Sequence, residues 1–234
     1  MGTEPVAPVR LLLVPSPLLG PATWAPVAAE LRQRGWDVLQ PAPYADVAHP
    51  ADVLAHLLRA VPQDAPLVLV PHSNAGLYAA ALAAELDVRG IVFVDAGVPA
   101  DEPVTPTAPP QFRTFLAGLA DHLGVLPVWT AWWEGEDVNA LFPDREQEAA
   151  VVAEQLRLPL AYFDEGVPSP AGWRDLPAAY LAFGDTYAAE RAEAERRGWP
   201  TRTLVGEHLH AIVDPSGVAD ALVGLLGRMG FRGA

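Results

Sequence analysis

The feature that most constrains the fold is an alternation of short apolar runs with helical segments. Leu67–Val70 is apolar throughout, Asn74–Leu86 is alanine-rich with helical spacing, and Gly90–Val94 is apolar again. Runs of this kind are typical of parallel strands that are buried on both faces. Strand, helix and strand at this spacing predict a right-handed βαβ unit.

The same alternation recurs on both sides of this unit. Further strands are predicted at Val9–Val14, Trp36–Leu39, Ala178–Phe183 and Thr201–Val205. Helical spacing predicts helices at Trp24–Arg34, Ala51–Ala60, Tyr187–Arg197 and Val218–Met229. The rhythm breaks over residues 97–177, where prolines, aromatic residues and two helical patterns (Gln111–Leu123 and Asp144–Leu158) occur. We therefore predict one α/β domain over residues 1–234, with a doubly wound, mostly parallel sheet and a helical lid insertion at about 97–177.

Charge excludes several classes of partner and chemistry. The formal net charge is −14, and all 15 cationic side chains are arginine. Without clustered cations, binding to nucleic acid or to an anionic membrane surface is not expected. The absence of lysine excludes a Schiff base and a Walker A site.

The chain has no cysteine, which excludes disulfides, thiolate nucleophiles and zinc–thiolate sites. The apolar run after Arg10 faintly resembles a signal peptide, but Glu4 precedes it and Pro15 and Pro17 interrupt it, so we read it as a strand. No apolar run approaches the length of a membrane span. We therefore expect a soluble, cytoplasmic protein.

Ser73 is the leading candidate for a catalytic residue. Only Pro71, His72 and Ser73 separate a predicted strand from the predicted helix. So tight a turn lifts the serine hydroxyl above the carboxyl edge of the sheet, and small residues such as Ala75 and Gly76 must follow it. The N–H of Asn74, at the helix N-terminus, could then bind a developing oxyanion. The alternative is an ordinary helix-capping serine.

A histidine follows the last predicted strand. His208 lies in the loop after Thr201–Val205, from which it can reach the sheet edge near Ser73, and His210 is the fallback. A lone histidine is more often structural. A histidine after the final strand together with a serine after a middle strand is rarely a coincidence.

These features resemble the α/β-hydrolase superfamily over essentially the whole chain. The resemblance is carried by three segments: Pro71-His72-Ser73-Asn74-Ala75-Gly76, Ile91-Val92-Phe93-Val94-Asp95-Ala96 and Gly206-Glu207-His208. The first matches the G-x-S-x-G elbow, except that Pro71 replaces the leading glycine. The resemblance implies that Ser73 is the nucleophile and His208 the general base and later acid.

Two acids compete for the third place of the implied triad. Asp185 follows the penultimate strand, which is the usual position in the superfamily, and it is the preferred candidate. Asp95 ends the strand after the nucleophile helix, a position that some members use. The acid would hold the tautomer of the histidine and stabilise the imidazolium.

The expected second oxyanion donor is absent at its usual place. Members of the superfamily carry His-Gly-x after the first strand of this set, and x donates its N–H. Here Pro15, Ser16 and Pro17 align with these residues, and proline has no N–H. Loss of one oxyanion donor costs about 2.7–4 kcal/mol. Leu18 or the Ser16 hydroxyl would have to substitute, or the reaction is not simple ester hydrolysis.

The aromatic residues of the insertion suggest a substrate pocket. Packed over Ser73, they would line a wide apolar pocket with little positive charge. The candidate substrate-binding residues are Trp129, Trp132, Trp133 and Phe142. The acidic run at 134–137 is read as a solvated loop, and no metal site is expected in it.

The predicted function is serine-dependent acyl transfer. The substrate would be a neutral, bulky, apolar or aromatic ester or thioester, including one carried by CoA or a carrier protein. Water or another nucleophile would release the acyl group, and no cofactor is expected. The alternative is a non-hydrolytic member of the fold that binds a hydrophobic small molecule or catalyses a non-covalent cyclisation, which Pro17 favours.

Overall fold

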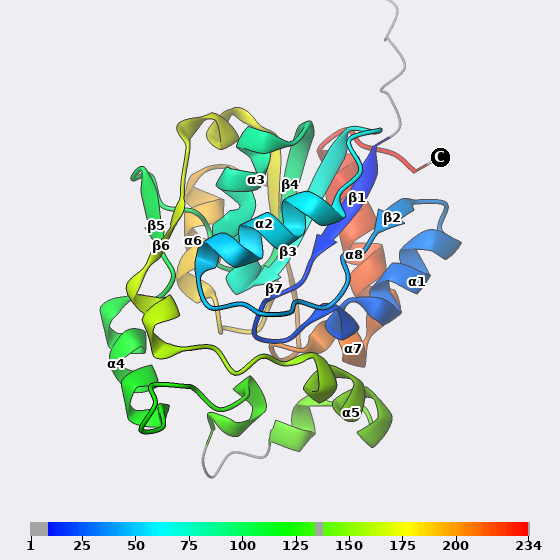
Figure 1. Ribbon diagram of the computed structural model, residues 1–234. Coiled ribbons are helices and arrows are strands. Elements are labelled where there is room, and N and C mark those ends of the chain that lie inside the picture. Colours follow the sequence, from blue (N-terminus) through cyan, green and yellow to red (C-terminus); the bar gives the residue numbers. More distant parts are fainter. Residues whose placement is uncertain (1–8, 134–137, 234) are drawn as a thin grey trace, which may run out of the picture.

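A six-stranded parallel sheet forms the centre of the computed structural model, which describes residues 9–133 and 138–233 (Figure 1). The strand order is β2-β1-β3-β4-β7-β8, and every pairing in this sheet is parallel. The strands are β1 (Arg10–Val14), β2 (Asp37–Leu39), β3 (Leu67–Ser73), β4 (Val88–Ala96), β7 (Ala178–Phe183) and β8 (Thr201–Leu204). The predicted fold class is confirmed.

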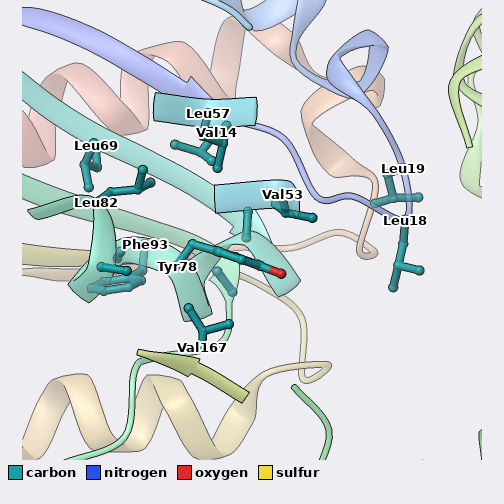
Figure 2. Packing of buried hydrophobic residues seen from close by; sticks show 14 of the residues in the cluster. Val14, Leu18, Leu19, Val53, Leu57, Leu69, Tyr78, Leu82, Phe93 and Val167 are labelled. Atoms are coloured by element: carbon teal, nitrogen blue, oxygen red, sulfur yellow. The ribbon is translucent and has the colours of Figure 1, made fainter. Parts of the chain in front are cut away.

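Helices cover both faces of the sheet because the apolar strands have no polar face. Leu12, Leu69 and Phe93 pack against α2 (Pro50–Ala60) and α3 (Ala79–Glu85), and Figure 2 shows Leu57 and Leu82 of these helices near the strand residues. On the opposite face, buried residues of the strands pack against α1 (Ala25–Gln33) and α8 (Pro215–Arg228). Each fully buried large apolar side chain stabilises the fold by about 1.5–3 kcal/mol.

The order of the strands changes direction between β1 and β3. The chain leaves β1 toward β2 on one side and then returns past β1 to β3 on the other. In open α/β sheets, ligands bind at such a switch point, outside the carboxyl ends of the strands. Ser73, the last residue of β3, lies at this point.

The segment between β4 and β7 contains β5 (Val104–Pro106), α4 (Pro110–Leu119), α5 (Arg145–Glu154) and β6 (Gly166–Pro168). Both predicted helices are present but shorter, and β5 and β6 form an antiparallel pair that the sequence did not predict. Figure 1 shows α4 and α5 beyond the carboxyl ends of β1 and β3. The acidic run at 134–137 lies outside the described residues. The role of the segment as a lid stays a prediction.

The remaining helices, α6 (Ala188–Arg196) and α7 (His210–Val213), follow β7 and β8. The helix predicted at Asn74–Leu86 is divided into a 3-10 turn at Asn74–Tyr78 and α3. Within the described residues, no helix has the length and apolar character needed to cross a membrane.

Candidate active site

Ser73 occupies a sharp turn with strained backbone geometry. Its φ and ψ are 60° and −133°, values that a residue with a side chain rarely adopts. The turn is held by a 3.1 Å hydrogen bond from the Gly97 N–H to the Ser73 carbonyl oxygen. A Cβ added at Gly76 would lie 1.9 Å from the Gly97 carbonyl oxygen, so this position requires glycine. The small residues expected after the serine are therefore needed for close backbone packing.

His208 is the histidine that meets Ser73. Its Nε2 lies 3.0 Å from Ser73 Oγ, and only 8% of its surface is exposed. His210, the fallback candidate, instead packs its ring 5.5 Å from that of Phe183. The loop from β8 to α7 thus brings His208 to the end of β3, 135 residues away in the chain.

The acid beside His208 is Asp95, and the preference for Asp185 as its partner is wrong. Asp95 Oδ2 accepts a 2.7 Å hydrogen bond from His208 Nδ1, whereas the Asp185 side chain is 86% exposed and pairs with Arg191. Asp95 lies one residue before the end of β4 and has a positive φ of 41°. It is therefore on the strand adjacent to that of Ser73, with its carboxylate hydrogen-bonded to the histidine.

The Asp95 carboxylate is fully buried, and both of its oxygens have partners. Oδ2 accepts the hydrogen bond from His208, and Oδ1 accepts a 3.0 Å hydrogen bond from the Phe183 N–H. A buried carboxylate requires such partners, and charge-assisted hydrogen bonds are the strongest available. With Nδ1–H donated to Asp95, the Nε2 lone pair of His208 is free to accept the proton of Ser73.

His72 packs against the ring of His208. The two rings are stacked with centroids 4.7 Å apart, and His72 Nε2–H donates to the backbone carbonyl oxygen of His208 at 3.0 Å. Burial, and next the proximity of His208, holds the pKa of His72 well below its usual value. His72 is therefore neutral and serves as packing and a hydrogen-bond donor.

The predicted oxyanion donors come from the turn after β3 and from the loop after β1. Asn74 begins the 3-10 turn directly after the serine. Val14 pairs with Pro71, so the loop after β1 continues beside the end of β3. In that loop Pro17 has no N–H, and the Leu18 N–H donates to Ser16 Oγ at 3.2 Å. The Leu18 N–H, which is the first N–H after Pro17, is therefore already hydrogen-bonded within this loop.

Tyr187 is a residue of the site that the sequence analysis missed. Its hydroxyl oxygen lies 3.4 Å from Ser73 Oγ, at the outer limit of hydrogen-bond distance, and its ring centroid is 5.7 Å from that of His208. Helical spacing predicted Tyr187 as the first residue of a helix. The available signal was an aromatic residue four positions after the end of β7, at the same sheet edge as Ser73.

The aromatic residues of the insertion divide into two groups. Trp129 faces the site, with its ring centroid 6.0 Å from that of His208, and Trp133 contacts Trp129 edge-on at 5.9 Å. Trp132 is 1% exposed and packs against Phe163 inside the insertion. Phe142 lines a different cavity of about 530 Å³, whose lining includes none of Ser73, His208 and Asp95. The predicted substrate-binding role therefore concerns Trp129 and Trp133.

Among the residues that the structure describes, no three His, Asp or Glu side chains lie close enough together to hold a metal ion. The site is thus a hydroxyl, an imidazole and a carboxylate joined by hydrogen bonds at the carboxyl end of the sheet.

The sheet order, the strained serine turn after β3 and the histidine after β8 define an α/β-hydrolase fold. Solved structures with this fold superpose on nearly the whole chain. An extracellular α/β-hydrolase from a Paenibacillus species has a TM-score of 0.74 at 19% identity, covering 93% of this chain and 99% of its own. Tomato methylketone synthase I has a TM-score of 0.74 at 16% identity, covering 96% and 100%. A methylesterase from Arabidopsis has a TM-score of 0.64 at 12% identity, covering 94% and 99%.

Sequence comparison adds nothing to this likeness, because no family model and no curated protein matches the chain. At these identities the similarity shows the α/β-hydrolase fold and leaves the reaction to be argued from the site.

Proposed function

We propose that the protein is a serine-dependent acyl-transfer enzyme with Ser73, His208 and Asp95 as its catalytic triad. The observation that carries the proposal is the chain of two hydrogen bonds, of 3.0 Å and 2.7 Å, that joins these side chains. In the first half-reaction, Ser73 Oγ attacks the carbonyl carbon and His208 Nε2 takes its proton. His208 then donates this proton to the leaving group.

The substrate is proposed to be a neutral ester or thioester with a bulky apolar or aromatic acyl group. The Trp129 ring lies beside His208, with Trp133 next to it, which favours an apolar group at the acyl side. Several neighbours are named as esterases or hydrolases: polyneuridine aldehyde esterase, a methylesterase and a pyrethroid hydrolase. Water, or a second nucleophile, would release the acyl group from Ser73.

The test is covalent labelling with a fluorophosphonate probe, read by intact mass. Wild type should gain one label, Ser73→Ala none, and Ser216→Ala, an exposed serine at the start of α8, one label as in wild type. Failure of folded wild type to label at neutral pH and high probe concentration would show that Ser73 is not activated.

Pro17 favours a second candidate function, a non-covalent reaction or the binding of a hydrophobic small molecule. A proline at the usual oxyanion position removes an N–H that acyl transfer ordinarily uses. The fold also occurs in a protein named as a synthase, tomato methylketone synthase I, described in complex with 2-tridecanone. Unlabelled but folded wild type that binds apolar ligands would support this candidate over the first.

A further inference from the structure

Acyl transfer at Ser73 requires hydrogen-bond donors for the oxyanion, and the backbone supplies an incomplete set. Asn74 can offer its N–H from the start of the 3-10 turn. On the other side of the site, Pro17 has no N–H and the Leu18 N–H donates to Ser16 Oγ. A second donor must therefore come from a side chain if the tetrahedral intermediate is to be stabilised, and the Tyr187 hydroxyl is a side-chain donor that lies beside Ser73 Oγ.

Tyr187 has the position and the protonation state that this donor needs. The loop between β7 and α6 brings its hydroxyl oxygen to 3.4 Å from Ser73 Oγ, and the neighbouring His208 ring lies against its own. Because the Ser73 proton is directed to His208 Nε2, the proton between Tyr187 and Ser73 belongs to the tyrosine. Burial raises the pKa of Tyr187, so the hydroxyl remains a protonated donor throughout the neutral range.

The oxyanion forms within reach of this hydroxyl. In the tetrahedral intermediate, the former carbonyl oxygen is attached to the same carbon as Ser73 Oγ. A donor adjacent to Oγ in the resting site can therefore reach the oxyanion after attack. Only a small movement of the Tyr187 side chain is needed to shorten the contact to an ordinary O–H···O distance.

We propose that the Tyr187 hydroxyl is the second oxyanion donor and replaces the N–H that Pro17 lacks. The proposal rests on the acyl-transfer function above. When Ser73 Oγ bonds to the acyl carbon, its proton moves to His208 Nε2 and the carbonyl π electrons move to the oxygen. That oxygen accepts hydrogen bonds from the Asn74 N–H and the Tyr187 O–H. Collapse restores the carbonyl, the leaving group takes the proton from His208, and Tyr187 keeps its own proton throughout.

The experiment compares the rate of fluorophosphonate labelling of wild type, Tyr187→Phe and Thr186→Val. The phosphonyl oxygen of the probe occupies the place of the oxyanion, so the rate reports on the donors without knowledge of the natural substrate. Tyr187→Phe keeps the ring and should label about a hundredfold more slowly. Thr186→Val removes a hydroxyl from the exposed neighbouring position and should label at the wild-type rate. Equal melting temperatures exclude unfolding as the cause.

A diphenyl phosphonate, whose leaving group is poorer, separates an oxyanion donor from a general acid. An oxyanion donor predicts the same slowing factor with both probes. A larger factor with the diphenyl phosphonate would mean that Tyr187 protonates the leaving group, and would overturn the assignment.

Affinity for a trifluoromethyl ketone, which adds to the serine as an oxyanion, should weaken by a similar factor in Tyr187→Phe. Labelling of wild type together with an undiminished rate and affinity in Tyr187→Phe would refute the donor role and leave the acyl-transfer function intact. Absence of labelling in wild type would refute the function itself.

Discussion

Asp95 combines complete burial with two hydrogen-bond donors, the His208 ring and the Phe183 N–H. Replacement by asparagine keeps the shape but can present an N–H to His208 Nδ1, which favours the wrong tautomer. We expect Asp95→Asn to slow the labelling of Ser73 by about 10⁴-fold. The measurement is the labelling rate constant under the same conditions for wild type and variant.

Asp185→Asn is the matched control for this prediction. The Asp185 side chain is exposed and its ion pair with Arg191 lies at the surface, where such pairs contribute little. We expect a labelling rate within about twofold of wild type. A large loss in Asp185→Asn together with a small one in Asp95→Asn would restore the original preference for Asp185.

His72 makes the stability of the fold depend on pH. Burial, and next the proximity of His208, lowers its pKa in the folded state, whereas the unfolded chain protonates near the ordinary value of about 6.5. Below that pH the unfolded state binds a proton that the folded state does not, so the free energy of unfolding falls as pH falls, by up to about 1.4 kcal/mol per pH unit.

Denaturant titrations at about pH 7.5 and about pH 5.5 test this effect. His72→Gln keeps a donor for the His208 carbonyl oxygen but cannot titrate. We expect the loss of stability between the two pH values to be smaller in His72→Gln than in wild type. Equal losses would show that other groups account for the pH dependence.

At the level of single residues, the sequence predicted Ser73 and His208 because each follows a strand at the same edge of a parallel sheet. It favoured Asp185 over Asp95, although both residues lie at the ends of predicted strands. The decision depends on the positive φ of Asp95 and on a register shift between His72 and Ser73, neither of which has a signal in the sequence.

Among the elements, the turn from β3 into α3 depends on one close backbone contact. A methyl group at Gly76 would meet the Gly97 carbonyl oxygen, so Gly76→Ala must displace the turn or β4. We expect it to lower the free energy of unfolding by about 1–3 kcal/mol and to slow labelling of Ser73. Chemical denaturation and the labelling rate measure the two effects.

Gly118→Ala is the control for a glycine without such a contact. Gly118 lies in α4, and a Cβ there would meet nothing within 4 Å. Alanine is the better helix former, so the free energy of unfolding should rise by about 0.5–1 kcal/mol. Stabilisation by Gly76→Ala as well would contradict the importance of the contact with Gly97.

The sequence predicted the inner strands of the central sheet because strands buried on both faces contain continuous apolar runs. The edge strands β2 and β8, which are partly exposed, were predicted from their place in the alternation of strands and helices. It missed β5 and β6, which are three residues long and include prolines, so neither shows a periodic pattern. It also read Tyr187 as part of a helix, since the course of the loop after β7 depends on tertiary packing.

In the whole molecule, α5 of the insertion is attached to the loop after β1. Glu154 accepts a hydrogen bond from the Ala22 N–H, and its side chain lies against Gly20, whose φ is +79°. We expect Glu154→Ala to loosen this attachment and to speed cleavage by trypsin after Arg145 and Arg157. Glu148→Ala, at a half-buried position of the same helix, should leave the cleavage rate unchanged.

Mass spectrometry of the first fragments measures this effect. Trypsin is well suited because the chain has only arginine cleavage sites. First cuts outside residues 97–177, at the same rate in both variants, would show that Glu154 does not hold the insertion in place.

The position of Asp95 has a consequence for how this scaffold can be modified. The proposed nucleophile and acid lie on the adjacent strands β3 and β4, so the loop after β7 does not carry the acid of the proposed triad. Sequences grafted between Phe183 and Tyr187, with Tyr187 itself kept, can therefore vary the groups near the site without disturbing the hydrogen bonds among Ser73, His208 and Asp95. Libraries built on this scaffold should therefore be diversified there first.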